Sequence, residues 1–141
     1  MIMTSRERVL AALRNEQPDR TPRDFWAELP AWQRLFAHVG HTDKDKLLDA
    51  LGVDVLDPIQ PTCPEMQPES LKRSFGDRLS YHGGIGMQNL LPGATTAQVA
   101  AEVRRYCEVL GKGSGYILGP AHLFQPDVPP QNVLAVYQAS P

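Results

Sequence analysis

The stretch GYILGPAHLFQPDVPPQNVLAVY, residues 115–137, contains a short apolar run that stands between a glycine and a Gly-Pro pair. An apolar run of this length with glycine and proline at its ends is typical of a buried strand. His122 follows in a proline-rich loop, and a new amphipathic segment comes after the loop. The order predicts a strand over 115–121, a loop that presents a histidine, and a helix over 129–139.

The same alternation of strand and helix occurs twice upstream of this stretch. Strands are expected over 53–59 and 78–85, and helices over 67–76 and 95–111. Thr95 and Gln98 have the spacing of a capping box, in which each side chain binds a free backbone N–H at the start of the longest helix. Residues 52–141 therefore read β-α-β-α-β-α, which indicates parallel strands with helices packed outside them.

Residues 1–51 show helical spacing instead. Thr4 and Glu7 form a second capping-box pattern before a helix that is expected to bury Val9, Leu10 and Leu13. Two more helices are expected, from about Pro30 to Gly40 and from about Thr42 to Gly52.

The fold class that follows is α/β, with about three parallel strands and their helices after an N-terminal helical segment. We expect one domain over 1–141, made of an N-terminal helical block (1–51) and a C-terminal block (52–141). This arrangement resembles part of a (β/α)₈ TIM barrel. A closed barrel takes about 250 residues, and this chain has 141.

Composition excludes several classes of function. The chain is 42% hydrophobic with a net charge of −2, so it is globular and has no basic field for nucleic acid. No apolar run approaches the roughly 20 residues that span a bilayer, so we expect no membrane partner. Charged residues begin within the first few positions, unlike in a signal peptide, so we expect a cytoplasmic location. Cys63 and Cys107 are far apart and are expected to be free thiols.

Each of the three strands ends in a polar group: Asp57, His82 and His122. Parallel strands bring such groups to one rim, where a carboxylate and two imidazoles can perform acid–base chemistry, bind a metal or hold an anionic substrate. Structural alternatives remain open, because Asp57 before Pro58 is a common turn starter and His82 can fill a gap in the packing. We take all three as candidate substrate-binding residues and expect no metal site, since no HxxH or HxC spacing is present.

Two blocks of sequence resemble a known family. MTSRERVLAALRNEQPDRTPRDF resembles the opening of the uroporphyrinogen decarboxylase superfamily. FGDRLSYHGGIGMQNLLPGATTAQVAAEVRRYCEVLGKGSGYILGPAHLFQPDVPPQNVLAVYQA resembles its closing third. The resemblance implies a single (β/α)₈ barrel with its site at the C-terminal mouth. It also implies a lyase that decarboxylates a tetrapyrrole, as in porphyrin biosynthesis, or another small carboxylated substrate, without a cofactor. Because the middle of the barrel is not represented, the chain looks like an internally shortened (truncated) member or a fragment.

The resemblance has departures that bear on function. The family's arginine-rich loop for substrate carboxylates is not matched by Arg20 and Arg23, and its catalytic aspartate lies in the unrepresented middle, so no catalytic residue is assigned. His122 stands where the decarboxylases have a histidine that contacts the porphyrinogen and where the zinc methyltransferases have a cysteine. Two alternatives stay open: a relative of the corrinoid-dependent methyltransferases, or a non-catalytic remnant.

A partial barrel also predicts self-association. Two sheet edges remain unpaired, and barrel-facing side chains such as Val53, Val55, Ile117 and Leu118 lack opposing strands. We therefore expect a homo-oligomer.

Overall fold

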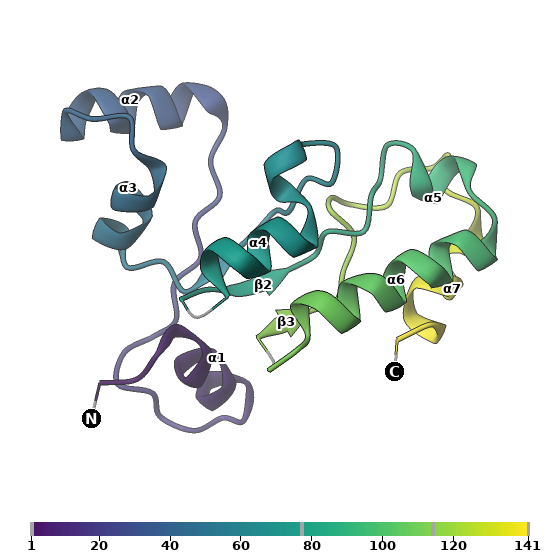
Figure 1. The fold of residues 1–141 in the computed structure, drawn as a ribbon, viewed down its shortest axis with the longest axis horizontal. Coiled ribbons are helices and arrows are strands. Elements are labelled where there is room, and N and C mark those ends of the chain that lie inside the picture. The colour runs from purple at the N-terminus through teal and green to yellow at the C-terminus, as the bar shows by residue number, and fades with distance from the viewer. Residues whose placement is uncertain (1, 77, 114, 141) are drawn as a thin grey trace.

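The computed structural model of the chain describes residues 2–76, 78–113 and 115–140. Its elements, labelled in Figure 1, are α1 (Ser5–Leu13), α2 (Leu29–Val39), α3 (Lys44–Leu51), β1 (Val55–Leu56), the 3₁₀ helix η1 (Pro64–Met66), α4 (Pro68–Phe75), β2 (Ser80–His82), α5 (Leu90–Gly93), α6 (Thr96–Leu110), β3 (Tyr116–Ile117) and α7 (Pro130–Gln138). The predicted fold class is confirmed, because helices precede a β-α-β-α-β-α block whose three strands form one sheet.

The sheet has the order β1-β2-β3, and both strand pairs are parallel. Its strands are shorter than the sequence predicts. β1 ends before Pro58, which has no N–H to give to a ladder. Isolated parallel bridges extend the pairing on both sides, from Asp24 to Val55 and from Ile85 to Pro120. The extended segment around Asp24 thus lies beside β1, at the edge away from β2.

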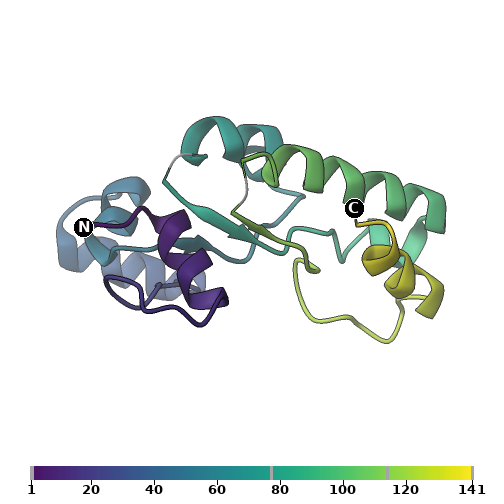
Figure 2. The same ribbon diagram turned by 90° about the horizontal axis from the view of Figure 1, so that it is seen from below.

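The two faces of the sheet have different neighbours. Leu56, Tyr81 and Tyr116 are register partners and pack with the hydrophobic core. The Tyr81 hydroxyl donates to the Leu71 carbonyl of α4 at 2.9 Å, so this face is the one covered by α4 and α6. Figure 2 shows these two helices on one side of the sheet and α1 on the other. Alternation along the strands turns His82 and Ile117 to the side away from α4 and α6.

The hydrophobic core belongs to the C-terminal block. It is made of Ile59, Leu71, Tyr81, Ile85, Leu91, Val99, Val103, Tyr106, Leu110, Val128, Ala135 and Val136. The capping box of Thr95 and Gln98 is present, and the buried face of α6 is the one that its helical spacing predicts. Buried Asn132 fixes α7 by donating to the carbonyls of Leu91 and Ala94, both at 2.9 Å.

The N-terminal block has little apolar burial of its own. The Thr4–Glu7 capping box is confirmed, but Leu13 is 61% exposed instead of buried, because α1 turns Arg8, Val9 and Ala11 inward and leaves its last turn in solvent. None of the α2 residues, all of which the structure describes, is buried. Burial of apolar surface therefore contributes little to holding this block in place.

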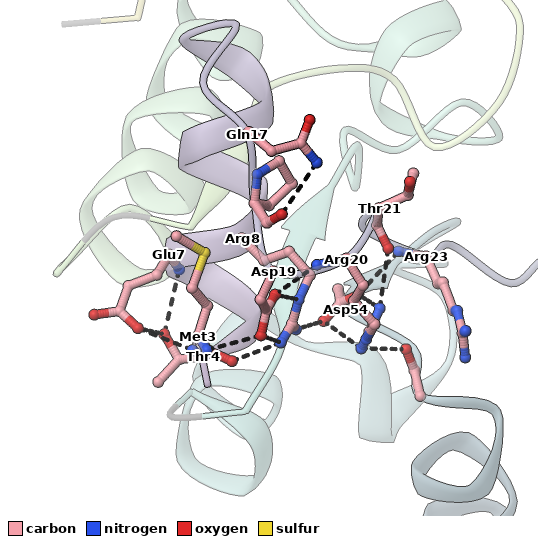
Figure 3. Close-up of polar contacts among 12 residues, drawn as sticks. Met3, Thr4, Glu7, Arg8, Gln17, Asp19, Arg20, Thr21, Arg23 and Asp54 are labelled. Atoms are coloured by element: carbon pink, nitrogen blue, oxygen red, sulfur yellow. Dashed lines mark hydrogen bonds and ion pairs between the residues drawn. The ribbon is translucent and has the colours of Figure 1, made fainter. Parts of the chain in front are cut away.

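Polar contacts to Asp54 tie the N-terminal block to the sheet (Figure 3). The fully buried Asp54 carboxylate accepts hydrogen bonds from the side chains of Arg8 and Arg20 and from the Arg23 backbone N–H. Arg8 is buried as well and also pairs with Asp19 at 2.7 Å. We call these five residues the Asp54 clasp. It joins α1, the segment that follows it and the start of β1.

Hydrogen bonds and charges within the Asp54 clasp favour the ionised forms of its two carboxyl groups, those of Asp54 and Asp19. Burial alone would raise the pKa of Asp54, but the hydrogen bonds from Arg20, the Arg23 N–H and Arg8 outweigh it and hold that pKa below its ordinary value. The hydrogen bond from Arg8 likewise lowers the pKa of Asp19.

In the described part of the chain, no helix combines the length and apolar character needed to cross a membrane.

Candidate active site at the carboxyl edge of the sheet

The three candidate groups follow the carboxyl ends of three neighbouring strands. Asp57 comes directly after β1, His82 is the last residue of β2, and His122 lies two residues beyond the Pro120 bridge that extends β3. Because all the strands are parallel, their carboxyl ends meet at one edge of the sheet. This edge, with the segment around Asp24, is called the rim below.

Asp57 and His82 form a hydrogen-bonded pair at the rim. Nδ1 of His82 lies 3.0 Å from Oδ2 of Asp57, and their side chains are 42% and 25% exposed. A carboxylate accepts, so in this pair Nδ1 carries the proton. The other ring nitrogen, Nε2, is then left to accept a proton or, in the imidazolium, to donate one.

Glycines beside the pair keep the backbone close to it. Gly83 has a φ of +82°, and a Cβ there would meet the Pro120 carbonyl at 2.8 Å. A Cβ on Gly119 would lie 3.4 Å from Nε2 of His82. Glycine at these two positions therefore lets β2 turn sharply and leaves room beside the reactive nitrogen.

Asp24 is a rim residue that the sequence did not indicate. Its parallel bridge to Val55 places Asp24 beside β1, the strand that leads directly to Asp57. Desolvation raises the pKa of Asp24, and the Asp57 charge adds to the rise, whereas the Phe25 N–H and His82 oppose it. The only local signal is an aspartate in an extended segment, which is too common to predict a site.

His122 reaches the rim from the β3 side of the sheet, whereas Asp24 lies on the β1 side. Its ring stands edge-on to Trp26 with the centroids 6.2 Å apart. His122 is exposed and Trp26 is 64% exposed, so neither ring fills the core. Because Trp26 follows the Asp24 segment and His122 follows β3, residues from the two edges of the sheet meet here.

Other polar groups are engaged elsewhere. Arg20 is bound to Asp54 and to the Gly52 carbonyl, and Arg23 donates to the Leu51 carbonyl, so these arginines serve the Asp54 clasp. Among the residues that the structure describes, no group of three or more histidines, cysteines or acids is arranged to hold a metal ion. Cys63 is exposed and Cys107 is partly buried, and both are free thiols.

The rim can therefore hold and transfer protons. It combines a half-exposed imidazole oriented by a carboxylate, a second carboxyl whose pKa is raised, and an exposed imidazole beside an indole. A positioned imidazole is the commonest general acid or base in proteins.

Comparison with known proteins agrees with the resemblance seen in the sequence. The family model of uroporphyrinogen decarboxylase (URO-D) matches residues 34–140. A uroporphyrinogen decarboxylase of Methylococcus capsulatus is 31% identical over 137 residues, which cover 94% of this chain and 33% of that protein. One of Legionella pneumophila strain Paris is 29% identical, with coverage of 94% and 34%. The chain spans about a third of the length of the curated relatives that it matches.

Proposed function

This chain belongs to the uroporphyrinogen decarboxylase family, and we propose that its rim is the proton-transfer part of a decarboxylating site. The observation that carries the proposal is the 3.0 Å contact between Nδ1 of His82 and Oδ2 of Asp57 at the carboxyl edge of parallel strands. Edges of this kind are where parallel α/β proteins build their sites.

Loss of CO₂ requires a proton donor. The bond between the carboxylate carbon and its neighbour breaks, CO₂ leaves, and the bonding electron pair remains on the neighbouring carbon. In the proposed reaction His82, as imidazolium, gives its Nε2 proton to that carbon, and solvent then reprotonates the ring. Asp57 accepts the hydrogen bond from Nδ1 and so holds the ring in position.

The substrate in this proposal is a small carboxylated molecule, with a tetrapyrrole as the first candidate. His122 is exposed at the rim beside the ring of Trp26, so its ring N–H can donate a hydrogen bond to a substrate carboxylate. Trp26, beside it, offers an apolar surface for a ring of the substrate.

We further propose that two copies of the chain associate through the side of the sheet that faces away from α4 and α6, over the part that α1 leaves exposed. Parallel sheets are normally covered on both faces. Ile117 on β3 is 37% exposed, and His82 on the same side of the sheet is half-exposed. A second copy that covers this side would also shield the rim from water.

Release of CO₂ from uroporphyrinogen tests the decarboxylation. Wild type is compared with His82→Gln and Asp57→Asn, and the matched control is His38→Gln, an exposed histidine on α2. Loss of a general acid or of its orienting partner slows such reactions about 100-fold or more. Turnover by wild type and by the control, but not by the two rim variants, is expected. No CO₂ from wild type, or equal rates in all four proteins, would refute the proposal.

A further inference from the structure

A cavity lies between the N-terminal block and the C-terminal block. Its volume is about 370 Å³, within the usual range for pockets that hold a small molecule. Helices α3 and α4, η1 and the end of β1 all contribute to its lining. The segment that carries Phe25 and Trp26 forms another wall.

Aromatic rings give this cavity its apolar character. Phe25 and Trp32 stand edge to face with their centroids 5.0 Å apart, and Trp26 completes this wall. Nζ of Lys44 lies 5.5 Å from the Trp32 ring centroid, so a cation already occupies one indole face. Faces of aromatic rings attract cations through the ring quadrupole, and tryptophan does so best.

The charged groups of the lining are mainly acidic. Asp45, Asp57 and Glu65 contribute carboxylates, against the single ammonium of Lys44. Asp45 and Glu65 are exposed at the cavity, and within the described ranges no ion pair involves either of them. An anionic ligand would meet this excess of negative charge, whereas a cation would be attracted by it.

We propose that this cavity binds a small organic cation, an ammonium ion with an apolar or aromatic body. The body packs against the rings of Phe25, Trp26 and Trp32, and the ammonium group lies between the aromatic wall and the carboxylates. Such a ligand differs in charge from the carboxylated substrate proposed for the rim. The cavity shares Asp57 and Trp26 with the rim, but the proposal of a bound cation stands whether or not the rim transfers protons.

Three probes with one body and different charges test the proposal: 3-phenylpropylammonium, 3-phenylpropanol and 3-phenylpropionate. The chain has two tryptophans, Trp26 and Trp32, and both line the cavity, so intrinsic fluorescence reports on binding directly. We expect the ammonium compound to bind at least about tenfold more tightly than the propionate, with the alcohol between them. Equal affinities, tightest binding of the propionate, or no fluorescence change with the ammonium compound would overturn the proposal.

Variants of exposed residues locate the charge effect. Asp45→Asn and Glu65→Gln should each weaken binding of the ammonium compound about two- to fivefold. Lys44→Met should strengthen it by a similar factor, because it removes a competing cation from Trp32. Glu108→Gln, an exposed acid on α6 outside the cavity lining, is the charge-matched control and should change nothing. If Glu108→Gln weakens binding as much as the lining variants do, affinity depends on the net charge of the chain alone, and the ammonium compound does not bind in this cavity.

Discussion

Replacing Asp54 with asparagine should destabilise the chain strongly, because the Asp54 clasp holds the N-terminal block. The asparagine side chain is nearly the same size but has no charge, and its NH₂ group faces arginine donors that need an acceptor. Arg20 Nη1 lies 2.7 Å from one carboxylate oxygen, and the Arg23 N–H lies 2.9 Å from the same oxygen. Nη1 of Arg8 donates to the other oxygen, so whichever oxygen the NH₂ group replaces, at least one arginine donor loses its acceptor.

The size of the effect follows from burial. Removing one partner of a buried ion pair costs about 3–5 kcal/mol. Arg8 keeps Asp19 as a second partner, and the Arg20 side chain is partly exposed, so the lower end, about 3 kcal/mol, is expected. At about 3 °C per kcal/mol for a chain of this size, the melting temperature falls by about 9 °C.

Circular dichroism during thermal and urea unfolding measures this change. The matched control is Asp49→Asn, which removes a carboxylate whose ion pair with Arg78, at 3.3 Å, is exposed on both sides. Exposed pairs contribute about 1 kcal/mol or less. If Asp54→Asn lowers the free energy of unfolding no more than Asp49→Asn does, the Asp54 clasp does not stabilise the fold.

Three further expectations concern pH, packing and assembly. The pKa of Asp54 is lower in the folded chain, so its contribution to the free energy of unfolding is present above the unfolded pKa of about 4 and is lost as pH falls below that value. Urea titrations below pH 4 should therefore show wild type losing stability faster than Asp54→Asn, and parallel pH profiles of the two proteins would contradict this. Asn132→Ala removes the Asn132 donor from the buried Leu91 carbonyl and the partly buried Ala94 carbonyl, and should lower the free energy of unfolding in urea by about 1–3 kcal/mol. A change under about 0.5 kcal/mol would refute this. Sedimentation should show wild type as a dimer and Ile117→Lys as a monomer, since a lysine there opposes burial of the sheet; a monomeric wild type would exclude the proposed association.

Local sequence signals predicted the local structure well. The capping boxes of Thr4 with Glu7 and of Thr95 with Gln98 depend on residues three apart, and both are present. The parallel direction of the strands also followed from the alternation of strand and helix, because parallel strands need crossover connections such as helices. These features depend on neighbours along the chain, which a sequence displays directly.

Contacts between distant segments could not be read in the same way. Arg8 and Asp54 are 46 residues apart, and nothing in either segment marks the other as its partner. The contact of Trp26 with His122 depends on where the segment before α2 lies against the sheet. The sequence indicated that Asp57 and His82 share a rim, but their hydrogen bond depends on a register that only the folded sheet defines.

Deuterium incorporation during turnover in D₂O tests most directly whether His82 delivers the proton at the rim. Uroporphyrinogen is incubated with wild type or with His82→Gln, and mass spectrometry measures deuterium in the decarboxylated product together with the CO₂ released. We expect one deuterium for each CO₂ with wild type, and a rate at least about 100-fold lower with His82→Gln. Product that forms and takes up deuterium at the same rate in both proteins would contradict it.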